Sequence, residues 1–129
     1  MGAAPDTRWF RDPTRGGIAS ALNELARATG LGVRLDEANI AVSPMVGGAC
    51  ELLGIDPFHV ANEGRLLAVV SAESQVQALA ACRSTSGGEQ GAIIGSIVAD
   101  PPRLVVARTR YGGERIVDQL VGDPLPRIC

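Results

Sequence analysis

Residues 12–36, with the sequence DPTRGGIASALNELARATGLGVRLD, decide the fold class of this chain. Ile18, Leu22 and Leu25 recur at helical spacing, which predicts a helix that ends at Gly30. Val33 and Leu35 then alternate with charged residues, which predicts a half-buried strand. A helix that passes directly into a strand indicates a domain built from both α and β structure.

The rest of the chain adds further elements of both kinds. Turn and capping residues bound apolar stretches that predict a helix from Ser43-Pro44 to Gly54, a short turn from Asp56-Pro57, a strand over Arg65–Val70, a helix capped by Ser71 with Val76, Leu79 and Ala80 inward, and strands over Ala92–Val98, Leu104–Ala107 and Ile116–Val121. Their spacing is uneven, and two of the late strands look like a hairpin. We therefore predict an α+β domain with a mixed sheet rather than an alternating parallel fold.

Length and composition fit one soluble domain. The chain has 129 residues, of which 46% are hydrophobic, 20% charged and 3% aromatic, with a net charge of −2. We expect an irregular segment over residues 1–11, the domain itself over 12–121 and a mobile tail over 122–129. No basic face suggests nucleic acid, no apolar run is long enough to cross a membrane, and no signal peptide is evident. A cytoplasmic protein is the expectation.

The three cysteines differ in their setting. Cys50 and Cys82 lie in apolar, helix-like stretches and are expected to be small buried hydrophobes. Their spacing fits neither a disulfide framework nor a structural metal site, so no metal is predicted. Cys129 ends the chain on an arm stiffened by Pro124 and Pro126, where a thiolate nucleophile can enter a site and withdraw. The alternative is a frayed end without function.

The run from Asp12 to Gly17 has the character of a phosphate site. Free amides at a helix start, glycines at positions 16 and 17, and the side chains of Thr14 and Arg15 suit a phosphate or its metal ion. The alternative is an ordinary helix start capped by Asp12 or Thr14. Two adjacent glycines are costly in a first helical turn, which suggests a requirement beyond capping.

A second candidate is the loop over residues 61–64, which precedes a predicted buried strand. Glu63 on this loop is well placed for general base work, although a solvated carboxylate is the commoner outcome. His59 is the only histidine and is expected to be structural. The segment over residues 112–115 predicts a turn with an ion pair.

Taken in order, these motifs resemble the C-terminal half of the HypE family of hydrogenase maturation proteins. The resemblance covers nearly the whole chain from Arg11 onward and rests on DPTRGG at 12–17, GACELLGIDP at 48–57, ANEG at 61–64, IIG at 93–95, GGER at 112–115 and the terminal PRIC at 126–129. The terminal PRIC is the most specific of them. The resemblance implies the fold of the C-terminal domain of aminoimidazole ribonucleotide synthase, which is layered α/β/α and partly ferredoxin-like.

The resemblance also implies an activity. In this family HypF carbamoylates the terminal thiol, here Cys129, and ATP with Mg²⁺ then drives dehydration of the thiocarboxamide to a thiocyanate, whose cyanide passes to iron on a HypC–HypD complex. Asp12, Thr14, Arg15, Gly16 and Gly17 would lie near the ATP phosphates, with Glu63 the first and Asp12 the second candidate for the base. Family members are homodimers with an ATP-binding N-terminal domain. This chain has no room for that domain, so we expect the fragment alone to be inactive.

Two alternatives remain open at this stage. One is another ATP-using enzyme of the aminoimidazole ribonucleotide synthase and selenophosphate synthetase superfamily, which would have no use for a terminal thiol. The other is a non-catalytic interaction module whose tail docks into a partner. Cys129→Ser distinguishes the interaction module from the carbamoyl acceptor, because simple docking would survive loss of the sulfur and carbamoyl transfer would not.

Overall fold

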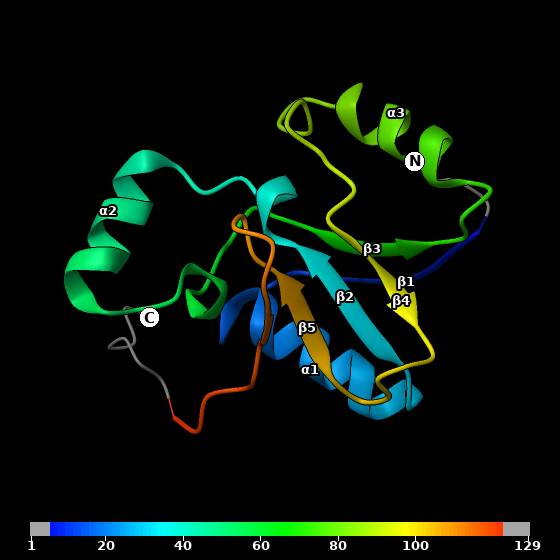
Figure 1. The fold of residues 1–129 in the computed structure, drawn as a ribbon. Helices are drawn as coiled ribbons and strands as arrows, with labels where there is room; N and C mark the ends of the chain where they lie inside the picture. The colour runs from blue at the N-terminus through cyan, green and yellow to red at the C-terminus, as the bar shows by residue number, and fades with distance from the viewer. Residues whose placement is uncertain (1–5, 123–129) are drawn as a thin grey trace.

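The computed structural model describes residues 6–122 (Figure 1). Within that range six strands and three α-helices, with two short 3-10 helices, follow one another along the chain: β1 (Thr7–Arg11), α1 (Gly17–Thr29), β2 (Gly32–Asp36), η1 (Glu37–Asn39), α2 (Pro44–Leu53), η2 (Pro57–His59), β3 (Leu67–Val70), α3 (Gln75–Arg83), β4 (Gly95–Val98), β5 (Val105–Arg108) and β6 (Glu114–Ile116). The predicted α+β class is confirmed.

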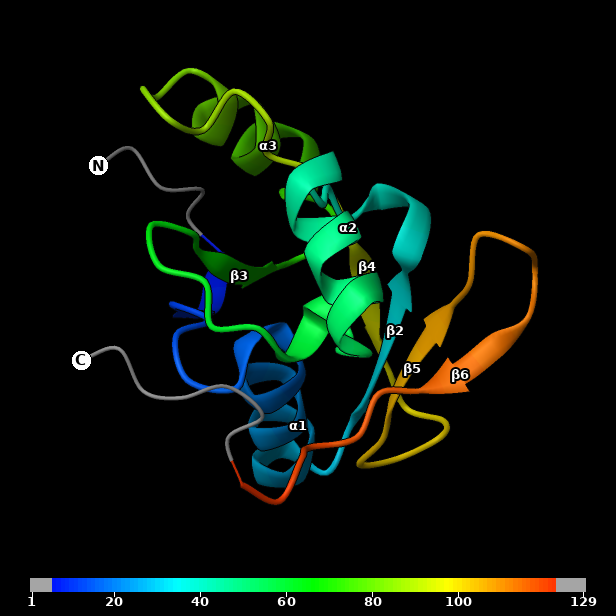
Figure 2. The same ribbon diagram turned by 90° about the vertical axis from the view of Figure 1, so that its left-hand side faces the viewer.

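The larger sheet has four strands in the order β4-β2-β5-β6. β2 pairs in parallel with β5 and antiparallel with β4, so the sheet is mixed as predicted. Val33 at its centre lies opposite Ile97 on one side and Val105 on the other. The sequence predicted a hairpin between two of the late strands without assigning the pair. β5 and β6 form that hairpin, whereas β4 and β5 are consecutive in the chain but separated in the sheet by β2. The hairpin is seen at the right of Figure 2.

The core lies between α1 and one face of this sheet. Small and medium side chains of α1 meet valines and a leucine of β2 and β5, and the fully or nearly fully buried set is Ala19, Leu22, Ala26, Val33, Leu35, Ile40, Phe58, Val105, Ala107 and Val117. The scarcity of aromatic residues therefore leaves a core of aliphatic side chains with one phenylalanine. The alanines of α1 bring its backbone close to the sheet, which fixes the position of the helix start.

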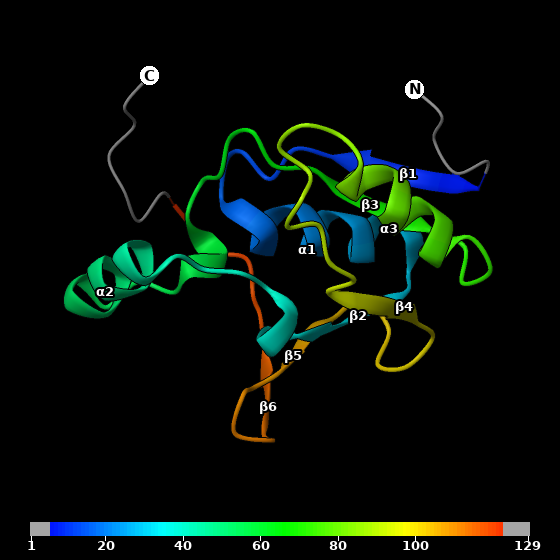
Figure 3. The ribbon, with the colours of Figure 1, turned by 90° about the horizontal axis from the view of Figure 1, so that it is seen from above.

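A second sheet pairs β1 with β3 antiparallel. In Figure 3 this ribbon lies on the side of α1 away from the larger sheet, and Trp9 and Leu67 from it pack against the core. The prediction of an irregular N-terminal segment is thus wrong for Thr7–Arg11. Its sequence TRWFR has no clear alternation, and its strand conformation depends on pairing with a strand almost sixty residues later, which local pattern cannot reveal.

The strand predicted over Ile116–Val121 is also largely wrong. β6 ends at Ile116, and Val117 adds one more backbone bond, to the carbonyl of Val105. The backbone carbonyls of Val117 and Asp118 accept hydrogen bonds from side chains of α1 and η2, so they are not available to a sheet partner. Apolar character therefore continues past the point where strand pairing stops.

The helix ends follow the predicted signals more closely. Gly30 closes α1 in the left-handed conformation with φ 74°, and Ser43 caps α2 by accepting a hydrogen bond from Val46 N at 3.3 Å. α3 differs, since it begins after Ser74 and none of its residues is buried. Val76, expected to point inward, is 73% exposed, because α3 has little of the domain to pack against.

Candidate functional site

The loop that leads into α1 is tight, and its charged and hydroxyl side chains face solvent. Thr14 N donates to the carbonyl of Asp12 at 2.9 Å, and Gly17 N donates to the carbonyl of Thr14 at 3.4 Å. Asp12, Thr14 and Arg15 are exposed. Gly16 takes the N-cap position at φ 70°, and among residues 6–122 no side chain caps this helix end. The positive end of the helix dipole is therefore left for solvent or a ligand.

The second glycine of the pair has a structural reason. Gly17 is buried with φ 62°, and a Cβ added there would lie 2.5 Å from the carbonyl oxygens of both Phe58 and Val60. Both observations require glycine, because an L side chain would be strained and would also strike backbone. The requirement beyond capping that the sequence suggested is thus the close approach of the η2 backbone to α1.

A backbone hydrogen bond joins the two candidate loops. Asn62 N donates to the carbonyl of Pro13 at 3.0 Å, so the segment that carries Glu63 runs beside the one that carries Asp12. Pro13 is buried, whereas the carboxylates of Asp12 and Glu63 are both exposed. The structure therefore brings the loops at 12–17 and 61–64 together, while Cys129 lies outside the described residues.

Behind this junction η2 is fixed by a network that sequence reasoning missed. Asp56 accepts hydrogen bonds from Phe58 N at 3.0 Å and from Arg115 Nη1 at 2.5 Å. The Arg115 guanidinium lies 5.0 Å from the centre of the Phe58 ring and 3.5 Å from Glu37 Oε1. Burial works to lower the pKa of Arg115, but Asp56 and Glu37 together raise it above its ordinary value. Sequence indicated an ion pair near residue 115 without identifying its partner.

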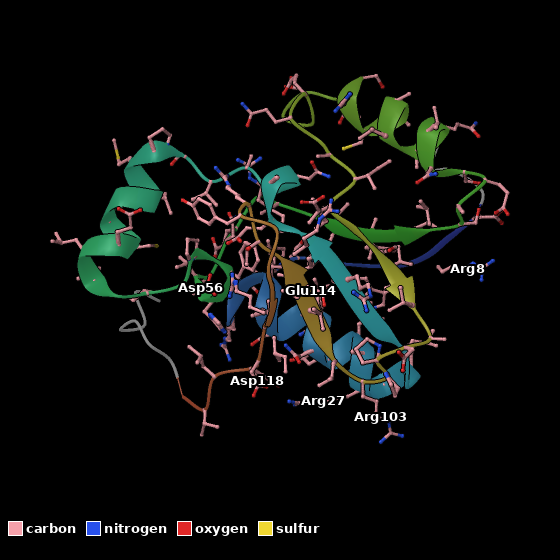
Figure 4. The ribbon with its side chains drawn as sticks, viewed as in Figure 1. Arg8, Arg27, Asp56, Arg103, Glu114 and Asp118 are labelled. Carbon is pink, nitrogen blue, oxygen red and sulfur yellow. The ribbon has the colours of Figure 1, made fainter. Side chains whose placement is uncertain are left out.

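The segment that leads toward the C-terminus is held by three side chains from α1 and η2. Asn23 Nδ2, almost fully buried, donates to the carbonyl of Val117 at 2.8 Å. His59 Nε2 donates to the carbonyl of Asp118 at 2.7 Å, and Arg27 Nη1 donates to Oε1 of residue 119 at 2.7 Å. In Figure 4, Asp118 and Arg27 are labelled near the bottom of the view, and Asp56 is labelled above them. His59 thus has the structural role that was expected of it.

The cysteines that the structure describes divide differently from expectation. Cys50 is buried at 6% exposure, as predicted. Cys82 is exposed, so the prediction of burial is wrong for it. Its helix, α3, lies at the edge of the domain, and its Sγ faces the carbonyl of Gly88 at 3.9 Å instead of a core.

Two general searches of residues 6–122 bear on the chemistry. No three His, Cys, Asp or Glu side chains of that range gather so that they could hold a metal ion. Nor does the range contain a helix long and apolar enough to span a membrane. The junction of the two loops combines a helix start without a side-chain cap, the exposed Arg15 and two exposed carboxylates. This combination suits a phosphorylated group beside a general base.

Residues 4–107 match the family described as AIR synthase related protein, C-terminal domain. The chain belongs to this family. The AIR synthase C-terminal fold was the architecture that the sequence resemblance implied, and it is confirmed.

Two relatives carry the same name. The chain is 50% identical over all 129 of its residues to carbamoyl dehydratase HypE of Azotobacter vinelandii, and covers 38% of that protein. It is 53% identical over 122 residues to carbamoyl dehydratase HypE of Bradyrhizobium diazoefficiens, covering 95% of this chain and 35% of that one. The chain therefore spans less than two-fifths of the length of these relatives.

Solved structures agree. A crystal structure of hydrogenase maturation protein HypE superposes with a TM-score of 0.90 at 38% identity, over 96% of this chain and 40% of that one. A HypE structure in complex with ATP gives 0.88 at 35% identity, over 96% and 39%. A HypE–HypF complex gives 0.84 at 38% identity, over 89% and 37%.

Proposed function

We propose that this chain is the C-terminal domain of a carbamoyl dehydratase that makes the cyanide ligands of [NiFe]-hydrogenase iron. The observation that carries the proposal is the 3.0 Å hydrogen bond from Asn62 N to the Pro13 carbonyl, which sets a carboxylate loop beside an uncapped helix start. Similarity to proteins named carbamoyl dehydratase, at 50% identity over the whole chain, supports the same conclusion.

The proposed reaction begins with transfer of a carbamoyl group to the thiolate of Cys129, which gives a thiocarboxamide. ATP phosphorylates the carboxamide oxygen, and phosphate then leaves as the nitrogen gives up its protons, so the sulfur ends as a thiocyanate. In balance, thiocarboxamide and ATP give thiocyanate, ADP, phosphate and one released proton, the second nitrogen proton leaving with the phosphate. Glu63 is our proposed acceptor for a nitrogen proton, with Asp12 as the second candidate, because both carboxylates are exposed at the junction of the loops.

The residues at the helix start fit a nucleotide phosphate. No side chain caps the helix start at Gly16, which is only half-buried, and the exposed Arg15 supplies a nearby positive charge for an anion. Asp12 and Thr14 present the oxygen ligands that Mg²⁺ prefers. Bound there, Mg²⁺ would neutralise charge on the transferring phosphoryl group. A HypE structure has been solved with ATP, which supports nucleotide binding by the longer protein.

The anchored segment at 117–119 supports delivery of Cys129 to this site. Asn23, which holds the carbonyl of Val117, follows Gly17 by six positions in α1, or about 9 Å along the helix axis. The ten residues that follow Gln119 and end at Cys129 reach at most about 33–36 Å when extended. That length exceeds the axial distance from Asn23 to the helix start, which supports access of Cys129 to the loop junction.

The partners and setting follow from the same proposal. A HypE–HypF complex has been solved, so HypF is our proposed source of the carbamoyl group. We further propose HypC–HypD as the acceptor of cyanide on iron, a homodimer for the longer protein and a cytoplasmic location.

The first test follows the sulfur. Intact-protein mass spectrometry of the chain after incubation with HypF, carbamoyl phosphate and ATP should show one carbamoyl group, and peptide mapping should place it on Cys129. Cys129→Ala should abolish the gain, whereas Cys82→Ser, at the exposed cysteine of α3, should not change it. A Cys129→Ala chain that still gains the group would refute the proposal.

The second test concerns the base and uses a longer relative of the chain. We define the graft as the Azotobacter vinelandii protein in which this chain replaces the matching C-terminal part. In the graft, Glu63→Gln should slow thiocyanate formation by about a hundredfold or more and leave carbamoylation unchanged. Glu73→Gln, at another exposed carboxylate, is the control. Normal dehydration in Glu63→Gln would exclude Glu63 as the base.

A further inference from the structure

Helix α2 carries an apolar surface that the described domain leaves uncovered. Its sequence, PMVGGACELL, has one charged residue, Glu51. Met45 is 85% exposed and Leu52 88% exposed, and Leu53 is 63% exposed. Only Cys50 is buried. A helix with so few polar side chains is normally enclosed by protein, so the exposure of α2 indicates a neighbour that the described domain does not supply.

One face of α2 has the pattern of a docking helix. Met45, Gly48, Ala49 and Leu52 stand at positions i, i+3, i+4 and i+7, the spacing by which helices seat in apolar grooves. A Cβ added at Gly48 would meet nothing within 4 Å, so backbone from a neighbour has room to come close at the middle of the face. We call these four residues the α2 face.

The helix is also preformed. The Ser43 hydroxyl caps its first turn, proline occupies its first position, and Gly54 closes it at φ 66° with bonds to the last turn. It projects from the body in Figure 3, with η2 as its main contact in the domain. Binding through the α2 face therefore requires little new ordering, which favours association.

The size of this surface decides what covers it. A stable complex between separate chains buries about 1,200–2,000 Å² in total, whereas contacts between domains of one chain succeed from about 600 Å². The α2 face has two large side chains with two small ones between them, so we assign it to the contacts between domains of one chain. A small surface is enough there, because the covalent connection supplies an effective concentration of about millimolar. The chain spans 38% of the Azotobacter vinelandii relative, so most of that protein lies outside the match.

We propose that the α2 face docks into the domain that precedes the matched region in the longer relatives, in an apolar groove that receives Met45 and Leu52. The proposal depends on family membership and not on the activity proposed above. It makes α2 a joint between the two parts of the longer protein, adjacent to η2 and so to the loop junction. A second copy of this chain is the competing occupant.

Cysteine footprinting tests the proposal. Met45→Cys and Leu52→Cys are alkylated with iodoacetamide in the isolated chain and in the graft, and tandem mass spectrometry assigns each rate. Both should react at least about tenfold more slowly in the graft. Tyr111→Cys, at a site 99% exposed in the β5–β6 turn, should change by less than about twofold and is the matched control.

Two results would overturn the proposal. Equal rates at position 45 and 52 in chain and graft mean that the preceding domain does not cover α2. Sedimentation of the isolated chain as a dimer that Leu52→Ser dissociates means that a second copy covers it instead. If the graft does not fold, the same comparison is made with the Azotobacter vinelandii protein and its C-terminal part, with cysteines at the positions that match 45, 52 and 111, and the same rate ratios decide.

Discussion

Replacement of Gly17 by alanine should destabilise the domain more than any other glycine-to-alanine change at its helix ends. The added Cβ would need a left-handed backbone, which costs about 1–2 kcal/mol. It would also lie 2.5 Å from two backbone carbonyl oxygens, of Phe58 and Val60, neither of which can rotate away as a side chain would. Displacing η2 disturbs the packing of Phe58, so we expect a total loss of about 3–5 kcal/mol.

Two other glycines separate these contributions. Gly30 has φ 74° with nothing within 4 Å of an added Cβ, so Gly30→Ala measures the backbone cost alone, about 1 kcal/mol. Gly48→Ala, in open space within α2, should stabilise the chain by up to about 1 kcal/mol. Urea unfolding followed by circular dichroism gives all three values. A Gly17→Ala loss no larger than that of Gly30→Ala would refute the claim that backbone contact with η2 requires this glycine.

Three further predictions use the same chain. Under native conditions Cys82 should react with iodoacetamide at least about a hundredfold faster than Cys50, measured by peptide mapping, because only Cys50 is buried. Asn23→Leu should lower the free energy of unfolding by about 2–3 kcal/mol in urea titration, since it leaves the carbonyl at position 117 without its donor. Arg108 donates a hydrogen bond to Asp36 and lowers the pKa of that carboxyl below its ordinary value of 3.8. The stability that this pair contributes is therefore present above pH 3.8 and is lost as the pH falls through the pKa of Asp36 in the folded state. In Arg108→Gln, NMR titration should find the pKa of Asp36 raised.

The sequence predicted those parts of the fold whose signals are local. The helix at residues 17–29 has regular apolar spacing and a glycine stop, and α2 has a serine cap with proline, so both are found where expected. β1 could not be predicted, because its conformation depends on pairing with residues 67–70. For α3 the prediction of a buried face was wrong, because the domain does not cover its apolar residues.

The candidate site divides along the same line. The glycines at 16 and 17 and the loop at 61–64 stood out by residue type, and the structure joins their loops through Asn62 and Pro13. The network of Asp56 and Arg115 was hidden, because two charged residues 59 positions apart give no local sign that they pair. Sequence therefore identified groups that face solvent and missed those that hold η2 in place behind them.

The parallel pairing of β2 with β5 has a consequence for the order in which the domain is made. Val33 cannot pair with Val105 until β5 has been synthesised, and α2, β3 and α3 all lie between the two strands in the chain. Closing a loop of that length carries an entropy cost that contacts repay only late in folding, so we expect slow folding. The contacts between α1 and η2 need only the first half of the chain. On the ribosome, the loop junction can therefore assemble before the strand that completes the core has been translated.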